Sequence, residues 1–134
     1  MTNISGIINN KVLGLILLII IFAFGCASGG SGYENISAEE AKKQLDVDSE
    51  IILLDVRTPA EHFEANIPNS LLIPVDVIKQ EAPELLPDKD ATIFVYCRSG
   101  RRSVTASLAL VEMGYTSVYN LGGIIDWPYE IQRG

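Results

Sequence analysis

The nine residues VYCRSGRRS, at positions 95–103, mark the place where a strand is expected to turn into a helix. An apolar, β-type run from Thr92 to Tyr96 ends at Cys97, and a helical apolar pattern begins near Ser103. Such a tight turn leaves unpaired backbone N–H groups at the helix N-terminus, backed by the positive end of the helix dipole. A thiol placed there is biased toward the nucleophilic thiolate. The stretch therefore predicts a reactive cysteine at a strand end.

The charge of this stretch differs from that of the whole chain. Arg98, Arg101 and Arg102 are three of only ten basic residues in a chain of net charge −7. We therefore expect the loop to be an electropositive island that attracts small anions. The alternative is an inert cysteine buried at the end of a core strand, which is the common fate of a lone cysteine. The flanking arginines and glycine favour the functional interpretation.

The composition excludes several classes of function. A net charge of −7 argues against nucleic-acid binding and against electrostatic attachment to anionic lipid. The two cysteines, Cys26 and Cys97, are too few for a disulfide framework. The single histidine, His62, has no cluster of metal ligands around it in the sequence, so neither a metal nor a cofactor is predicted.

Strands alternate with helices at short spacing from residue 33 onward. Ser37 and Glu40 form a predicted capping box for a helix through Leu45, and Thr58 and Glu61 form a second one with Pro59 at the first helical position. The expected strands lie at residues 51–56, 71–73, 92–96 and 118–121. This alternation predicts an α/β fold with a mostly parallel central sheet flanked by helices, in which ligands bind at the carboxyl ends of the strands.

Three further helical segments are expected. Residues 75–86 should be helical in part, with an interruption at Pro83, and residues 124–131 should form a short final helix. The helix after Cys97 should end at Gly114 as its C-terminal cap. Its apolar face is predicted to consist of Val104, Leu108, Val111 and Met113.

Asp55 and Arg57 lie two residues apart at a predicted strand end. They could bind substrate, but we favour a supporting role in which they pair with each other or cap backbone groups near the loop. His62 falls in the next predicted helix and is expected to be a surface or half-buried residue rather than a general base.

The N-terminal segment resembles a prokaryotic lipoprotein signal. An apolar run from Val12 to Phe24 is too short to span a membrane comfortably and ends at Gly25-Cys26, before a Gly/Ser-rich tether. Ala23 stands where leucine is common in such signals. We expect a signal peptide at 1–25, lipid on Cys26 with a flexible tether through 32, and the folded domain at 33–134. The alternative is an uncleaved anchor, and both place the domain on a prokaryotic membrane, outside the cytoplasm.

The loop from Cys97 to Ser103 resembles the active-site loop of the rhodanese-like sulfurtransferases. Three further segments carry the same resemblance over nearly all of residues 33–134: Leu54 to Glu61, Asn66 to Ser70 with Ile73-Pro74, and Val118 to Ile124 with Trp127. The chain departs from the family pattern beside Ile67-Pro68, where Ala65-Asn66 and Asn69-Ser70 replace the common Gly-His and Gly-Ala.

The resemblance implies a single rhodanese-like domain, a monomer, that transfers sulfur in two steps. Cys97 would take a sulfur atom from a small sulfur-containing anion such as thiosulfate, and a thiol or cyanide would then accept it. Ser103 is expected to cap the following helix and to reach the persulfide. The implied substrate-binding residues are Arg98, Ser99, Gly100, Arg101, Arg102 and Ser103.

Two other functions remain open from the sequence. Cysteine phosphatases and arsenate reductases with a Cys-x5-Arg loop would need arginine at position 103, which is Ser103, whereas Arg102 gives a loop one residue shorter. A persulfide carrier or binding module on the membrane needs the same thiolate pocket as the enzyme. A thioredoxin-like redox role is disfavoured because no resolving cysteine lies near Cys97.

Overall fold

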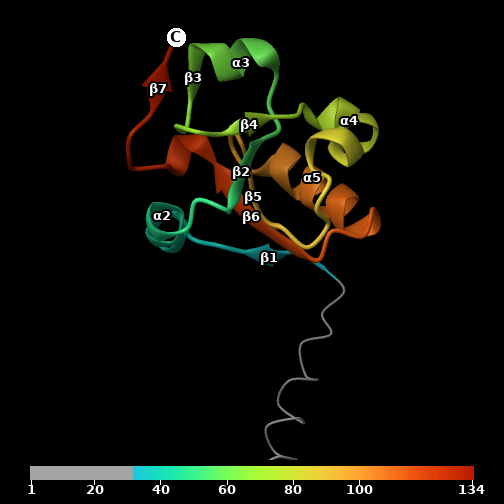
Figure 1. Ribbon diagram of the computed structural model, residues 1–134. Coiled ribbons are helices and arrows are strands. Elements are labelled where there is room, and N and C mark those ends of the chain that lie inside the picture. The colour runs from blue at the N-terminus through green and yellow to red at the C-terminus, as the bar shows by residue number, and fades with distance from the viewer. Residues whose placement is uncertain (1–31) are drawn as a thin grey trace, which may run out of the picture. The chain divides into compact units, whose positions relative to one another are not determined.

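Five parallel strands form the central sheet of the computed structural model, which describes residues 32–134 (Figure 1). Their order across the sheet is β1-β6-β5-β2-β4, so β5 lies at the centre and ends at Cys97. The predicted α/β fold with a mostly parallel sheet is confirmed. The expected signal peptide and the lipid site at Cys26 lie outside the described residues. The strands are β1 Glu34–Asn35, β2 Ile52–Asp55, β4 Leu71–Leu72, β5 Thr92–Cys97 and β6 Ser117–Gly123.

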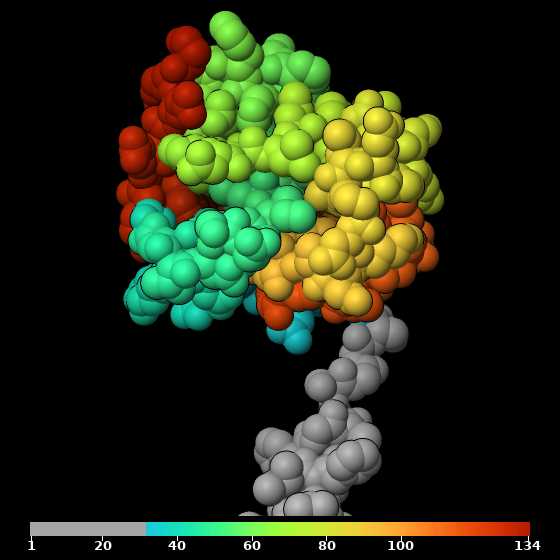
Figure 2. Space-filling model, in the orientation of Figure 1, coloured from blue at the N-terminus to red at the C-terminus, as the bar shows by residue number. Residues whose placement is uncertain are grey.

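The helices flank this sheet on both faces. Helix α2 lies on one side, and α4 and α5 lie on the other (Figure 1). A second, two-stranded antiparallel sheet pairs β3 with β7 and places the red C-terminal residues against the green segment of α3 and β3 (Figure 2). The remaining elements are α2 Ala38–Val47, α3 Pro59–Glu64, β3 Ala65–Asn66, η1 Val75–Val77, α4 Ile78–Leu85, α5 Arg101–Glu112, η2 Ile124–Asp126 and β7 Gln132–Arg133.

Side-chain alternation along β5 decides which way Cys97 points. Val95 and Cys97 belong to the core cluster beneath α4 and α5, whereas Phe94 and Tyr96 belong to the cluster on the opposite face. All four side chains are almost completely buried, as expected for a strand covered on both faces. Cys97 therefore faces α5, and Tyr96 faces away from it.

Both predicted capping residues begin their helices. The Ser37 hydroxyl accepts the Glu40 N–H at 3.2 Å, although the Glu40 carboxylate bonds to Gln44 instead of closing the box. The second box is complete, because Thr58 Oγ1 accepts the Glu61 N–H and the Glu61 carboxylate accepts the Thr58 N–H. This second box fixes the Glu61 side chain at the start of α3.

The predicted face of α5 is correct only in part: Val111 and Met113 are partly buried against the core, but Leu108 is not. The helix begins at Arg101, and Leu108 is 48% exposed. Small residues allow the helix to approach the sheet closely. A pattern of large apolar side chains alone does not identify such a face. The buried face consists of Ser103, Ala106, Ser107, Ala109 and Leu110. Gly114 does follow the end of the helix with φ 95°, and its N–H donates to the Val111 carbonyl at 3.0 Å, as a C-terminal cap should.

Two other helical predictions need correction. Pro83 lies inside α4 without breaking it; the helix type changes earlier, between Val77 and Ile78. The last helix is only the short 3₁₀ turn η2, because Trp127 adopts an extended conformation before Pro128. In the described part of the chain, no helix has both the length and the apolar character needed to cross a membrane.

The burial of α5 gives a direct test of its corrected face. Leu110→Ala should lower the free energy of unfolding by about 2–5 kcal/mol, because it leaves a cavity under the sheet. Leu108→Ala, on the same helix but largely exposed, should change it by less than about 0.5 kcal/mol. Urea denaturation of the two variants measures both values, and equal losses would show that the face has been assigned wrongly.

Candidate active site

Backbone N–H groups converge on the sulfur of Cys97. The N–H of Gly100 lies 3.0 Å from Sγ and the N–H of Ser103 lies 3.3 Å from it. Gly100 is the N-cap of α5 and has φ 102°, a conformation that glycine adopts without steric cost. This left-handed residue turns the chain back over the strand end. The predicted ring of N–H donors is therefore present around the thiol.

This geometry changes the acidity of Cys97. Burial of the thiol, which is 1% exposed, acts to raise its pKa, because the thiolate loses solvent. Hydrogen bonds from Ser103, and from the N–H groups of Gly100 and Ser99, favour the thiolate and outweigh burial. The net effect lowers the pKa of Cys97 below its ordinary value. A larger share of the thiol is then nucleophilic near neutral pH.

Ser103 does not cap the helix as expected from the sequence. It is the third residue of α5 and is fully buried. Its hydroxyl lies 2.7 Å from Asn120 Oδ1 and 2.8 Å from the Gly100 carbonyl, so its single proton bonds to one of them at a time. Asn120 Oδ1 also accepts the Gly122 N–H at 3.1 Å. The contact between Ser103 and Asn120 thus ties the loop to β6. The sequence did not reveal this role of Asn120.

The end of β6 lies directly against the loop. Gly123 pairs with Cys97 across the sheet. A Cβ atom at position 123 would overlap the Arg98 carbonyl oxygen and come within 2.7 Å of Ser99 Cα. The Ile125 N–H donates to the same Arg98 carbonyl at 3.2 Å. Glycine is therefore required at position 123 because the backbone of the loop occupies the space of a side chain.

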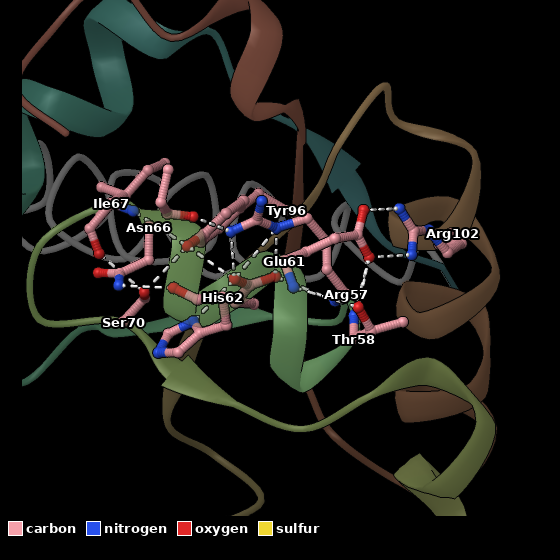
Figure 3. Close-up of polar contacts among 11 residues, drawn as sticks. Arg57, Thr58, Glu61, His62, Asn66, Ile67, Ser70, Tyr96 and Arg102 are labelled. Carbon is pink, nitrogen blue, oxygen red and sulfur yellow. Dashed lines mark hydrogen bonds and ion pairs between the residues drawn. The ribbon is translucent and has the colours of Figure 1, made fainter. Parts of the chain in front are cut away.

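The three loop arginines are not equivalent. Arg98 and Arg101 are exposed and form no ion pair with any residue in the range 32–134. Arg102 is held by Glu61 of α3, with Nη1 and Nη2 each 2.8 Å from a carboxylate oxygen (Figure 3). Among the described residues, the positive charge of the loop that is not held in an ion pair thus comes from Arg98 and Arg101.

The predicted pairing of Asp55 with Arg57 is present. Asp55 is completely buried at the end of β2, and Arg57 Nη2 lies 2.7 Å from its Oδ2. The Tyr96 hydroxyl donates to the same oxygen at 3.1 Å, and burial raises the pKa of that hydroxyl to about 12. Arg57 also donates to the Ala65 carbonyl at 2.6 Å. This network fixes α3 and β3 over the strand ends rather than contacting Cys97.

His62 belongs to the same network. Its side chain is 23% exposed, and Nδ1 lies 2.9 Å from Asp55 Oδ2. The expectation of a half-buried helix histidine is confirmed. Within residues 32–134, no group of three or more potential protein ligands is arranged to hold a metal ion.

A separate cleft of about 400 Å³ lies on the α2 side of the molecule. It is lined by α2 together with the segments around Asn69 and Tyr129, and by no residue of the loop from Cys97 to Ser103. The candidate site at Cys97 is therefore separate from this cleft.

The fold and the site together define a class of protein. A cysteine lies at the carboxyl end of the central parallel strand, with N–H donors at a helix N-terminus around its sulfur, an arrangement that favours anions and a thiolate. The rhodanese-like domain family model matches residues 37–129. The chain therefore belongs to the rhodanese-like domain family.

Similar proteins include a sulfurtransferase of Allochromatium vinosum, which is 40% identical over 93 residues, covering 69% of this chain and 85% of that protein. A thiosulfate sulfurtransferase of Escherichia coli is 40% identical over 73 residues, covering 54% of this chain and 70% of that one. Among solved structures, an E. coli rhodanese with anions is 36% identical with a TM-score of 0.59, and covers 63% of this chain and 99% of its own.

The close contact at Gly123 generates a prediction. Gly123→Ala should push the Arg98–Ser99 backbone away and draw the N–H donors off Cys97, so the pKa of the thiol should rise. Each unit of that rise lowers the thiolate fraction at neutral pH by up to about tenfold. Alkylation of Cys97 by iodoacetamide at pH 7 reports the effect. Gly32→Ala, where a Cβ meets open space, is the control, and an unchanged rate in Gly123→Ala would contradict the contact.

Proposed function

We propose that this domain is a sulfurtransferase that carries sulfur as a persulfide on Cys97. The observation that supports this most is the convergence of the Gly100 and Ser103 N–H groups on Sγ, with further donors at the start of α5. A terminal persulfide sulfur is a single anionic atom, and N–H donors that converge on one point stabilise it. The naming of related proteins as sulfurtransferases supports the same chemistry.

The proposed first step uses a thiosulfate-like donor. The Cys97 thiolate attacks the outer sulfur of the donor and forms an S–S bond. The bond between the outer sulfur and the sulfonate sulfur breaks, and its electron pair leaves with sulfite. Arg98 and Arg101, which are exposed on the loop, attract the dianionic donor.

The proposed second step returns the thiolate. A thiol or cyanide acceptor attacks the terminal sulfur of the persulfide, and the S–S electron pair returns to Cys97. Cyanide leaves as thiocyanate, and no redox partner is required. The N–H donors of the loop stabilise the thiolate at both ends of the cycle.

The phosphatase alternative is less compatible with the site. A phosphatase loop needs an arginine whose guanidinium N–H groups point at the phosphoryl oxygens, because they stabilise the charge on these oxygens in the transition state. Position 103 holds a buried serine bonded toward β6, and the fork of Arg102 is held by Glu61. We therefore expect negligible hydrolysis of aryl phosphates.

We further propose that the domain acts outside the cytoplasm on a prokaryotic membrane, held by lipid on Cys26. The support is the apolar run that ends at Gly25-Cys26 and the Gly/Ser tether that follows it. On this proposal the donor and acceptor are small molecules outside the cytoplasm. An uncleaved N-terminal anchor would place the domain in the same location.

The sulfur-transfer proposal predicts a single site of modification. Thiosulfate should add the mass of one sulfur atom to the wild-type domain and none to Cys97→Ser, which should also lack thiocyanate formation with cyanide. Cys97 is the only cysteine among residues 32–134, so the assignment is unambiguous. A sulfur adduct without turnover would indicate a carrier. Aryl phosphate hydrolysis that is lost in Cys97→Ser would overturn the proposal.

The membrane proposal predicts how the precursor is processed. The mature protein should begin at Cys26 and carry lipid, and Cys26→Ala should accumulate as a precursor of higher mass. Mass spectrometry of the membrane fraction gives the result. A wild-type membrane form that still begins before Cys26 would replace lipidation with the uncleaved anchor.

A further inference from the structure

The carboxylate of Glu61 is held by four donors. Oε2 accepts from the Thr58 N–H and from the Thr58 hydroxyl, both at 3.0 Å, and from Arg102 Nη1 at 2.8 Å. Oε1 accepts from Arg102 Nη2 at 2.8 Å (Figure 3). The Thr58 capping box fixes Glu61 before Arg102 binds, so the carboxylate is a prearranged receptor for the guanidinium.

This pair joins two elements that are far apart in the sequence. Glu61 and Arg102 are separated by 41 residues and link α3 to the second residue of α5, one residue from Ser103 and its contact with Cys97. The side chains are 28% and 34% exposed, so the ion pair is partly shielded from solvent. The bonds from Arg102 lower the pKa of Glu61 to about 2, and the carboxylate is charged at any physiological pH. Both partners of the pair are therefore charged at physiological pH.

Arg102 would otherwise serve the anion site. Arg102 is the residue before Ser103, whose backbone N–H lies 3.3 Å from the Cys97 sulfur, so its side chain starts beside the anion site. Bidentate forks are the preferred way for proteins to hold tetrahedral oxyanions. In this chain, the carboxylate occupies that fork and cancels its charge.

We propose that Glu61 is a specificity-determining residue that withdraws Arg102 from the anion site and thereby disfavours tetrahedral oxyanions such as phosphate and sulfate. The inference rests on the proposed function, because it concerns which anions compete with a sulfur donor at Cys97. The site then recruits anions through exposed Arg98 and Arg101, which hold no fixed fork near the sulfur. Glu61 acts through Arg102 and touches neither the donor nor Cys97, so it is a positioning residue.

The test is protection of Cys97 from iodoacetamide by inorganic phosphate, at constant ionic strength and at a pH where the thiol of each variant is ionised. Glu61→Gln keeps a residue type that closes capping boxes, but it removes the charge and one of the two acceptor oxygens. We expect the phosphate concentration for half-protection to fall about fivefold. Sulfate should behave in the same way.

Two further variants complete the test. Glu64→Gln removes a charge from an exposed residue of the same helix and should leave protection unchanged. The double variant Glu61→Gln/Arg102→Gln should return to the wild-type value, because the released guanidinium is gone. Thermal melting confirms that each variant is folded.

Two results would overturn the inference. One is equal protection in Glu61→Gln and Glu64→Gln. The other is weaker phosphate protection in Arg102→Gln alone than in the wild type, which would mean that Arg102 already contacts anions; this result does not depend on whether Glu61→Gln folds. The assay needs only a reactive thiol, so it separates this inference from the proposed function. Loss of sulfur transfer in the wild type would contradict the function alone.

Discussion

The hydrogen bonds from backbone N–H groups to the sulfur of Cys97 are the interaction on which the rest of this site depends. They exist only because the central strand ends at the cysteine and α5 begins four residues later, with Gly100 in a left-handed conformation between them. Burial opposes ionisation of the thiol, and the N–H donors overcome it. A site with the same cysteine but without this turn would hold an inert, protonated thiol.

The surrounding structure keeps that turn in place from three directions. From β6, Gly123 lets the backbone approach Arg98, and Asn120 holds Ser103. From α3, Glu61 holds Arg102 at the start of α5. Beneath the loop, the small face of α5 packs on the sheet. None of these residues reacts itself. Replacing any of them should still change the reactivity of Cys97, because each helps to position the N–H donors around the sulfur atom.

Local patterns in the sequence predicted the local features of the fold. The strand that ends at Cys97, the capping box of Thr58 and Glu61, and the glycine cap at Gly114 all follow from neighbouring residues and are present. The bond from Ser103 to Asn120 and the pair of Glu61 with Arg102 could not be predicted, since they depend on how distant elements pack. The fully buried residues of α5 were missed for a similar reason, because the sheet selects small side chains such as Ala106 there, although Val111 and Met113 do pack against the core.

The pH dependence of Cys97 alkylation by iodoacetamide tests the central claim most directly. Only the thiolate reacts, so the rate rises with pH through the pKa of the thiol. If the loop N–H groups stabilise the thiolate, the midpoint of the folded domain lies below the ordinary cysteine value of about 8.5, and it returns to that value when the domain is unfolded in urea. A midpoint at or above about 8.5 in the folded domain would show that burial prevails, and would contradict the account.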